Sequence, residues 1–366
     1  MGPNRHRLAP DHLPALTSPS ADTAPRRRQL LTLLGASALA PGAWAQQADS
    51  ASTLYATRPD AMAYARTLAD AHLLPLDWVL DTVGQARFLP RVPPLMVPST
   101  RPAARNWAVY RSRFVEPIRI RAARAFVDRH AGTLQRAERE FGVPMGIVAG
   151  ILGVETIYGR NMGNISVLDA LGTLSFDFPA AHPRAQARTT YFRGELGTFL
   201  ALSFRARRDP RGYLGSYAGA MGLPQFMPSS WEKYAIDYDG DGVVDLFSSV
   251  ADAIGSVANY FIAHGWTPGM PTHFPVQFDT ARLQLPTLLA PDILPSFSPQ
   301  EMQALGVVLP EAALAHAGKL ALIELPNGSG PSNYVAGTTN FYAITRYNWS
   351  SFYAMSVIEL GDAASA

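Results

Sequence analysis

The chain has 366 residues, of which 48% are hydrophobic, so it is long enough for more than one domain and can bury a sizeable core. It contains no cysteine, which excludes disulfides, thiolate metal sites, cysteine catalysis and a cysteine-borne N-terminal lipid. Only Lys233 and Lys319 are lysines, so no lysine-rich tract supports binding to nucleic acid or to a membrane surface.

The N-terminus has the features of an export signal. Arg26-Arg27-Arg28 precedes a short apolar run ending at Ala40, and Ala43-Trp44-Ala45 is a small-x-small cleavage motif. The arginine pair before Gln29-Leu30-Leu31 is typical of twin-arginine signals, although Arg26 replaces the usual Ser or Thr. The apolar run is shorter than the roughly 20 residues of a spanning helix. We therefore expect a periplasmic protein that is soluble after cleavage at Ala45, without stable membrane insertion.

This export segment also carries all of the basic excess of the chain. Residues 1–45 hold five arginines and two aspartates, so the mature chain has 26 basic and 27 acidic residues. The mature protein is therefore nearly neutral, which gives no electrostatic argument for a nucleic-acid partner.

Periodicity predicts a mainly helical (α+β) chain. Residues 58–87 read as two short helices, with leucines 73, 74 and 76 among their core positions, and a connector rich in proline, expected to be extended, follows as far as Pro102. Residues 119–141 are an amphipathic helix, and residues 143–264 are mostly helical. Short alternating runs broken by prolines fill residues 267–326 and end in the turn signal Pro326-Asn327-Gly328, which predicts a small β-subdomain. The tail, residues 348–360, returns to helix and is expected to pack on the core.

Glu155 is the leading candidate for chemistry. After Pro144, helical spacing places Ile147, Ile151, Val154 and Glu155 on one face, so the carboxylate points inward. A carboxyl group against an apolar wall has a raised pKa and can hold a proton near neutral pH, as a general acid must. The alternative is a buried glutamate neutralised by an arginine such as Arg160.

A second candidate site is the run Asp237-Tyr238-Asp239-Gly240-Asp241-Gly242-Val243-Val244-Asp245. Oxygen side chains at positions 1, 3, 5 and 9 and glycine at position 6 match an EF-hand calcium loop, with the Val243 carbonyl as the backbone ligand. Position 12 is Ser248, which cannot supply the usual bidentate carboxylate. The pattern favours a structural calcium site over an empty turn.

Four blocks in this order closely resemble the lytic murein transglycosylase B family, whose members cut peptidoglycan glycan strands, and the resemblance covers roughly residues 54–362. The blocks are Gly153-Val154-Glu155-Thr156-Ile157-Tyr158-Gly159-Arg160, Leu168-Asp169-Ala170-Leu171-Gly172-Thr173-Leu174-Ser175-Phe176, Gly215-Ser216-Tyr217-Ala218-Gly219-Ala220-Met221-Gly222-Leu223-Pro224-Gln225-Phe226-Met227-Pro228-Ser229-Ser230 and Asn340-Phe341-Tyr342-Ala343-Ile344-Thr345-Arg346-Tyr347-Asn348.

The resemblance implies a lysozyme-like catalytic core with a helical N-terminal domain and a small β-subdomain. We expect a signal peptide (1–45), a helical region with a proline-rich connector (46–118), the catalytic core (119–266), the β-subdomain (267–335) and a C-terminal segment (336–366). The family's substrate-contacting Ser, Gln and Asn fall on Ser216, Gln225 and Asn340. Aromatic platforms for sugar faces are expected among Tyr110, Tyr158, Tyr260, Tyr342 and Tyr347, although core packing is the more typical role of each taken singly.

The family uses one carboxylate, which explains why no second candidate has an environment like that of Glu155. Hydrolysing glycosidases usually carry two. The possible second carboxylates are Asp169, Asp177, Glu195 and Asp209, and Asp169 reads as a cap or first-turn residue of a helix. Glu155 would protonate the leaving oxygen and then deprotonate the C6 hydroxyl of the same muramyl residue, giving a 1,6-anhydro ring with no catalytic cofactor. A hydrolytic muramidase and a non-catalytic peptidoglycan-binding protein are the alternatives.

The resemblance also suggests that a later aspartate closes the calcium loop. Asp252 is the candidate, but it comes one residue later than the family pattern. It either ligates the ion or caps the helix that follows.

Overall fold

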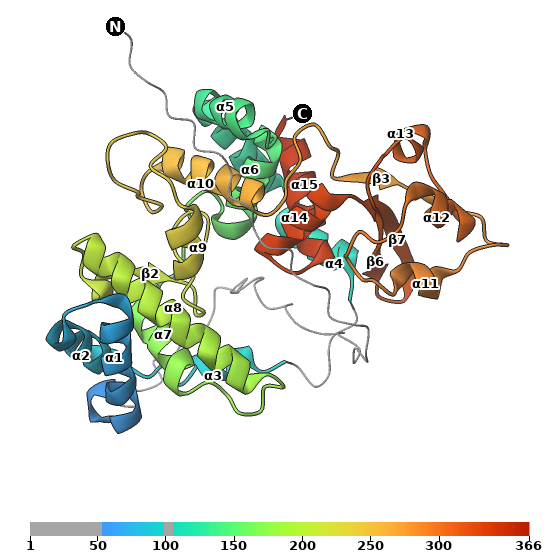
Figure 1. Ribbon diagram of the computed structural model, residues 1–366. Coiled ribbons are helices and arrows are strands. Elements are labelled where there is room, and N and C mark those ends of the chain that lie inside the picture. Colours follow the sequence, from blue (N-terminus) through green and yellow to red (C-terminus); the bar gives the residue numbers. More distant parts are fainter. Residues whose placement is uncertain (1–52, 99–104, 366) are drawn as a thin grey trace, which may run out of the picture. The chain divides into compact units, whose positions relative to one another are not determined.

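The computed structural model describes residues 53–98 and 105–365 (Figure 1). The predicted export signal lies outside the described residues. Within this part of the chain no helix is both long enough and apolar enough to cross a membrane.

The largest hydrophobic core surrounds α6 (Met145–Thr156), the helix that carries Glu155. Helix α6 packs on α15 (Ser351–Ser365), α5 (Pro117–Phe141) and α10 (Val250–Ala263), and Figure 1 shows α6 beside the red C-terminal helix α15. Helices α4 (Trp107–Phe114), α9 (Pro228–Tyr234) and α14 (Thr339–Tyr347) and one face of strand β6 (Ala321–Asn327) also contribute to this core. The C-terminal helix α15 is thus part of this core.

Glycine allows α6 and α15 to approach closely. A Cβ at Gly150 would lie 2.2 Å from the Val357 carbonyl oxygen, and one at Gly361 would lie 2.2 Å from the Gly146 carbonyl oxygen. Larger residues at these positions would push the two helices apart. The close contact matters because α15 also contributes a partner to Glu155.

A second core joins the N-terminal helices to two helices that follow Glu155 in sequence. Its buried side chains include Val79, Leu171 and Phe199. Its elements are η1 (Tyr55–Thr57), α1 (Pro59–His72), α2 (Leu76–Gln85), α3 (Val92–Met96), α7 (Val167–Phe176), α8 (Ala185–Arg205) and η2 (Pro210–Gly212). The domain limits expected from sequence stay a prediction.

Two sequence expectations in this region were wrong. Leu73 is 91% exposed, because it ends α1 in the left-handed conformation (φ 53°), and Leu76 is also exposed. The proline-rich connector contains a helical turn, α3, with Pro93 and Pro94 at its start. A first turn tolerates proline because its N–H groups have no intrahelical partner.

The third core lies under the predicted β-subdomain. The antiparallel hairpin of β6 (Ala321–Asn327) and β7 (Gly330–Gly337) turns at Gly328, whose φ is 66°, and β3 (His273–Pro275) pairs with the other side of β7. Two further short pairs join distant segments: β4 (Gln277–Phe278) with β5 (Val307–Val308), and β1 (Ile165–Ser166) with β2 (Leu214–Gly215). Short helices α11 (Leu285–Leu289), α12 (Pro299–Ala304) and α13 (Glu311–Leu314) complete this part.

Candidate active site

Glu155 lies in the last turn of α6, partly exposed to a small cleft of about 100 Å³. The cleft is lined by Glu155, Ala218, Ala220, Gln225, Phe226, Met227, Ser230, Tyr260 and Tyr347. Glu155 is the one carboxylate in this lining. The prediction that it faces inward from an apolar helix is therefore reproduced by the structure.

A tyrosine, and not an arginine, is the partner of this carboxylate. The Tyr353 hydroxyl donates a hydrogen bond of 2.6 Å to Glu155 Oε1. Arg160 is exposed and forms no ion pair with Glu155 in the described part of the chain. Burial raises the pKa of Glu155 to about 7, and the hydrogen bond from Tyr353 opposes part of that rise. Glu155 can therefore carry an exchangeable proton near neutral pH.

Two predicted tyrosines form an aromatic cluster in the cleft. Tyr260 of α10 and Tyr347 of α14 have ring centroids 4.8 Å apart, and Phe226 lies within 6 Å of both. The Tyr347 hydroxyl donates to the Pro224 carbonyl, so the ring is held against the loop that carries Gln225. An apolar aromatic wall of this kind suits the hydrophobic face of a sugar.

Gln225 both lines the cleft and fastens its loop. Its backbone is in the left-handed region (φ 51°), and its Nε2 donates to the carbonyls of Met162 (3.0 Å) and Gly222 (2.9 Å). The side-chain amide of Gln225 thus links its own loop, at Gly222, to the segment that follows α6, at Met162. A residue of this kind can hold the wall of the cleft while presenting polar atoms to a ligand.

Ser216 and Asn340 are not part of the cleft lining. Ser216 Oγ accepts hydrogen bonds from the Ala218 and Ala220 amides, so it shapes the loop whose alanines line the cleft. Asn340 is fully buried in the first turn of α14. Its Oδ1 accepts a hydrogen bond from the Thr267 amide, and its Nδ2 donates to the carbonyls of Thr267 and Met270. The expected substrate contact of Asn340 does not fit this position, because every polar atom of its amide already has a partner inside the protein.

The other three predicted tyrosines also lie outside the lining. Tyr110 packs between Phe114 and Phe352, and burial, followed by the charge of Glu155, raises its pKa. Tyr158 stacks on Phe126 at 4.6 Å, and Tyr342 packs edge-on against Trp349. These three tyrosines therefore fit the core-packing role better than the role of a sugar platform.

The remaining candidate carboxylates all have structural partners. Asp169 lies in the first turn of α7 and accepts from the Arg87 amide, as its predicted helix-start position implies. Asp177 binds Tyr55 and Arg58, and Asp209 binds Arg211. Glu195 is buried and accepts from the amide and hydroxyl of Ser229, which holds the start of α9 beside the cleft. None of them is in the lining with Glu155.

A larger groove of about 640 Å³ lies between α2 and the end of α8, away from Glu155. It is lined by Trp78, Asp81, Thr82, Gln85, Ser203, Phe204, Arg207, Arg208, Asp209, Pro210 and Arg211. Its carboxylates are exposed and paired with Gln85 and Arg211. Size alone therefore does not identify the active site, since this groove lacks a carboxyl group set against an apolar wall as Glu155 is.

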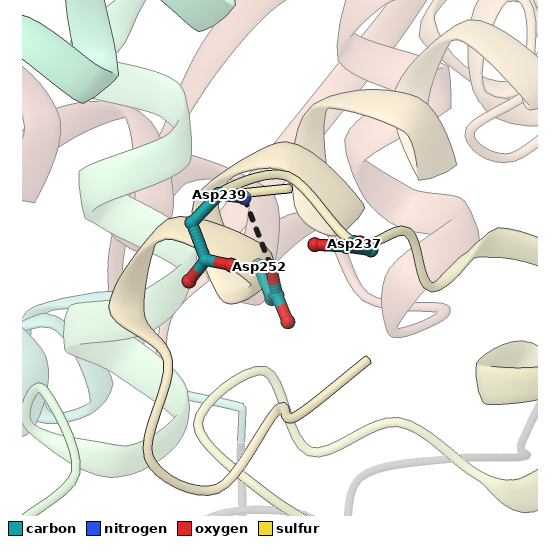
Figure 2. Close-up of side chains that lie close together, drawn as sticks. All are labelled: Asp237, Asp239 and Asp252. Carbon is teal, nitrogen blue, oxygen red and sulfur yellow. Dashed lines mark hydrogen bonds between the residues drawn. The ribbon is translucent and has the colours of Figure 1, made fainter. Parts of the chain in front are cut away.

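The acidic loop brings three aspartates together (Figure 2). Carboxylate oxygens of Asp237, Asp239 and Asp252 lie within 4.8 Å of one another. Asp241 and Asp245, also predicted as ligands, are not in this group, and Val243 is 61% exposed. Asp245 instead accepts from the amides of Phe247 and Ser248.

Asp252 is buried and organises the loop from within. Its Oδ1 accepts from the amides of Tyr238 (2.7 Å) and Asp239 (3.3 Å), and its Oδ2 accepts from the Asp245 amide (2.8 Å). Helix α10 is capped by Ser249, so the alternative role of Asp252 as the cap is wrong. An all-oxygen donor set of three carboxylates is the type that calcium prefers.

Comparison with known proteins agrees with this geometry. The model of the transglycosylase SLT domain family matches residues 57–362. The chain belongs to this family. It is 39% identical over 332 residues to the membrane-bound lytic murein transglycosylase B of Escherichia coli, covering 85% of this chain and 84% of that protein.

Solved structures of transglycosylase family members have the same fold. The E. coli lytic transglycosylase SLT35, in complex with bulgecin A, is 37% identical and superimposes with a TM-score of 0.75 over 85% of this chain and 94% of that one. SLT35 has also been solved in complex with calcium, with a TM-score of 0.73 and the same identity and coverage. SltB3 of Pseudomonas aeruginosa, solved with NAG-anhNAM-pentapeptide, is 28% identical with a TM-score of 0.68 over 83% and 78% of the chains. The predicted family, lysozyme-like fold and enzyme class are confirmed.

Sequence reasoning missed Tyr353, the direct partner of the glutamate in this transglycosylase chain. The tail was expected to pack back on the core, but nothing in its local pattern distinguishes Tyr353 from the apolar residues around it. Only the contact between α15 and α6 shows which residue of the tail meets Glu155.

Proposed function

We propose that the protein is a lytic transglycosylase that cleaves the β-1,4 bond between N-acetylmuramic acid and N-acetylglucosamine in peptidoglycan and leaves 1,6-anhydromuramyl ends. The observation that carries this proposal is Glu155, a carboxyl group with a pKa of about 7 in a cleft whose lining contains no second carboxylate. Glycosidases that add water usually need an acid and a separate base or nucleophile. One carboxyl group suffices where the substrate supplies its own hydroxyl.

In this mechanism Glu155 acts twice. Its proton moves to the glycosidic oxygen as the bond from that oxygen to C1 of the muramyl residue breaks. The resulting carboxylate then takes the proton of the C6 hydroxyl as the C6 oxygen bonds to C1, which closes the anhydro ring and returns Glu155 to its acid form. No water is consumed, and the 2-acetamido group of the muramyl residue stabilises the cationic intermediate.

The cleft offers both polar and apolar groups for binding a glycan strand. Gln225 hydrogen-bonds the glycan, and Tyr260 and Tyr347 contact a sugar face. Support comes from their shared position in the lining with Glu155. Glycan strands of peptidoglycan are the partner that this combination fits, because their sugars are polar at the edges and apolar on their faces.

Mass analysis of the products released from purified sacculi tests the reaction. Anhydro ends are lighter than hydrated reducing ends by one water molecule. Products with anhydro ends support the proposal, and reducing ends would identify a hydrolytic muramidase. Intact sacculi after incubation with well-folded protein would point to a non-catalytic binding protein.

We also propose that the acidic loop binds calcium in a structural role. The support is the convergence of Asp237, Asp239 and Asp252, together with the calcium complex of SLT35. The Asp252 carboxylate holds three backbone amides of the loop, so an ion there would stabilise the turn between α9 and α10. The ion takes no part in bond cleavage.

Export to the periplasm completes the proposal. The arginine pair 27–28 and the motif Ala43-Trp44-Ala45 support a twin-arginine signal that is removed to leave Gln46 as the first residue. N-terminal sequencing of the exported protein, with fractionation of membranes and periplasm, tests both points. Protein that keeps residues 1–45 and is recovered only with membranes would contradict them.

A further inference from the structure

The chain makes a strained turn directly after the catalytic helix. Ile157, Tyr158 and Gly159 all have positive φ, at 51°, 57° and 87°. Left-handed backbone is unfavourable for a tyrosine and more so for the β-branched isoleucine. Such a conformation persists only where surrounding contacts hold it, and it clusters at functional sites.

One hydroxyl group holds this turn from within. Thr156, the residue after Glu155, is fully buried, and its Oγ1 accepts a hydrogen bond of 3.0 Å from the Gly159 amide. The same Oγ1 lies 2.9 Å from the Leu223 carbonyl, to which it donates, and 3.3 Å from the Leu152 carbonyl of its own helix. Thr156 therefore ties the end of α6 both to the turn that follows it and to a loop 67 residues further along the chain.

That loop is the one that carries Gln225. Leu223 comes two residues before Gln225, and Gln225 Nε2 donates back to the Met162 carbonyl, on the far side of the strained turn. Two hydrogen bonds thus connect the end of α6 and the segment after it to the loop that carries Gln225: one from the Thr156 hydroxyl to the Leu223 carbonyl, and one from Gln225 Nε2 to the Met162 carbonyl. Little room is left between them, because a Cβ at Gly159 would lie 2.8 Å from the Leu223 side chain.

We propose that Thr156 is a positioning residue, whose hydroxyl fixes Glu155 relative to Gln225 by clamping the turn after α6 to the Leu223 carbonyl. This inference rests on the proposed function of Glu155. Without the hydroxyl, the Leu223 carbonyl and the Gly159 amide lose a buried partner, and the strained turn relaxes. Glu155, one residue away, then shifts relative to the glycan bond held beside Gln225.

Three substitutions and one control test the clamp. Thr156→Val keeps the shape and removes the hydroxyl, Thr156→Ser keeps the hydroxyl, and Thr156→Cys offers a weaker donor. Thr173→Val is the matched control. Thr173 is also fully buried with its hydroxyl bonded to backbone, between Leu89 and the Arg87 carbonyl in the second core.

We expect kcat on sacculi to fall about 100-fold in Thr156→Val, the scale of a misplacement near 1 Å, with a much smaller change in KM. Thr156→Ser should restore kcat to near the wild-type value, and Thr156→Cys should lie between. Thr173→Val should lose stability while keeping kcat. If Thr156→Val fails to fold, the kcat values of the other two variants decide the question. A lower kcat in Thr156→Cys than in Thr156→Ser supports the proposal, and equal values overturn it. A folded Thr156→Val enzyme with wild-type kcat would overturn the proposal.

A measurement without substrate separates this inference from the proposed reaction. The carboxyl carbon signal of Glu155, followed by NMR through a pH titration, reports the environment of that group. We expect its pKa to move from about 7 towards the ordinary value in Thr156→Val and not in Thr173→Val. An unchanged titration would show that Thr156 serves stability alone. Activity retained in Glu155→Gln would instead refute the proposed mechanism, whatever the titration of the Thr156 variants shows.

Discussion

The Tyr353 hydroxyl donates a hydrogen bond of 2.6 Å to Glu155 Oε1 across 198 residues of sequence. This bond favours the ionised form of Glu155, whereas burial favours the protonated form. The balance leaves the pKa of Glu155 at about 7. A residue in that range can give and take a proton within one catalytic cycle.

Removing the tyrosine hydroxyl should shift that balance. In Tyr353→Phe the ionised form of Glu155 loses its donor, so the pKa of Glu155 should rise above about 7. The alkaline limb of the activity profile should then move to higher pH, while Glu155 becomes a weaker acid and gives its proton to the glycosidic oxygen less readily. Turnover of sacculi between pH 5 and about 9 measures this. A limb that moves to lower pH would show that Tyr353 acts in the opposite sense.

Glu155→Gln should abolish cleavage and leave the fold and glycan binding largely intact. The substitution keeps size and a hydrogen-bond acceptor for Tyr353 but removes the exchangeable proton. Because general acid-base assistance is typically worth about 100 to 10,000-fold, and one residue serves two roles, the loss should be at least that large. Turnover assays paired with circular dichroism check it. Substantial activity in a well-folded variant would contradict the mechanism.

The same residue should make stability depend on pH. The pKa of Glu155 rises from 4.5 to about 7 on folding, so the folded state keeps its proton where the unfolded state has lost it. Stability is then lost as pH rises from about 4.5 through about 7. Glu155→Gln should therefore be more stable than the wild type at pH 8 by about 1 to 3 kcal/mol, and no more stable at pH 4. Urea unfolding of both proteins at the two pH values measures this difference.

Asp169→Asn and Gln225→Ala should behave differently from Glu155→Gln. Asp169 holds the Arg87 amide and the start of α7, so its loss should lower stability with little effect on turnover. Gln225→Ala should weaken binding and turnover by about tenfold, since it removes hydrogen bonds and no proton transfer. A folded Asp169→Asn enzyme as inactive as Glu155→Gln would reveal a second catalytic carboxylate and favour hydrolysis.

Calcium should raise the melting temperature through the acidic loop. Binding to the folded state alone stabilises it by about 2.7 kcal/mol at a hundredfold excess over Kd. Asp237→Ala combined with Asp239→Ala, which removes two of the three converging carboxylates, should lose this increment. Asp252→Asn should destabilise the protein by about 1 to 3 kcal/mol in chelator as well, because Asp252 holds three buried or half-buried backbone amides. Equal melting of the wild type in calcium and in chelator would exclude the metal.

Much of the architecture was predictable because it depends on local patterns. Helical spacing predicted the inward position of Glu155, and the turn signal at Gly328 predicted the β6–β7 hairpin. The spacing of the acidic loop predicted that Asp237 and Asp239 would converge. Each of these features depends on residues within one or two turns of each other, so the sequence carries the signal directly.

The composition of the cleft was decided by tertiary structure. Tyr353 reaches Glu155 only because α15 packs on α6, where Gly150 and Gly361 permit close approach. Asn340 carries an amide group as Gln225 does, and Tyr110 is a tyrosine like Tyr347, yet Asn340 and Tyr110 are used inside the core. Which member of such a pair faces the cleft depends on the packing of helices far apart in sequence. Local spacing cannot encode that choice, because it depends on which faces are buried when the helices meet.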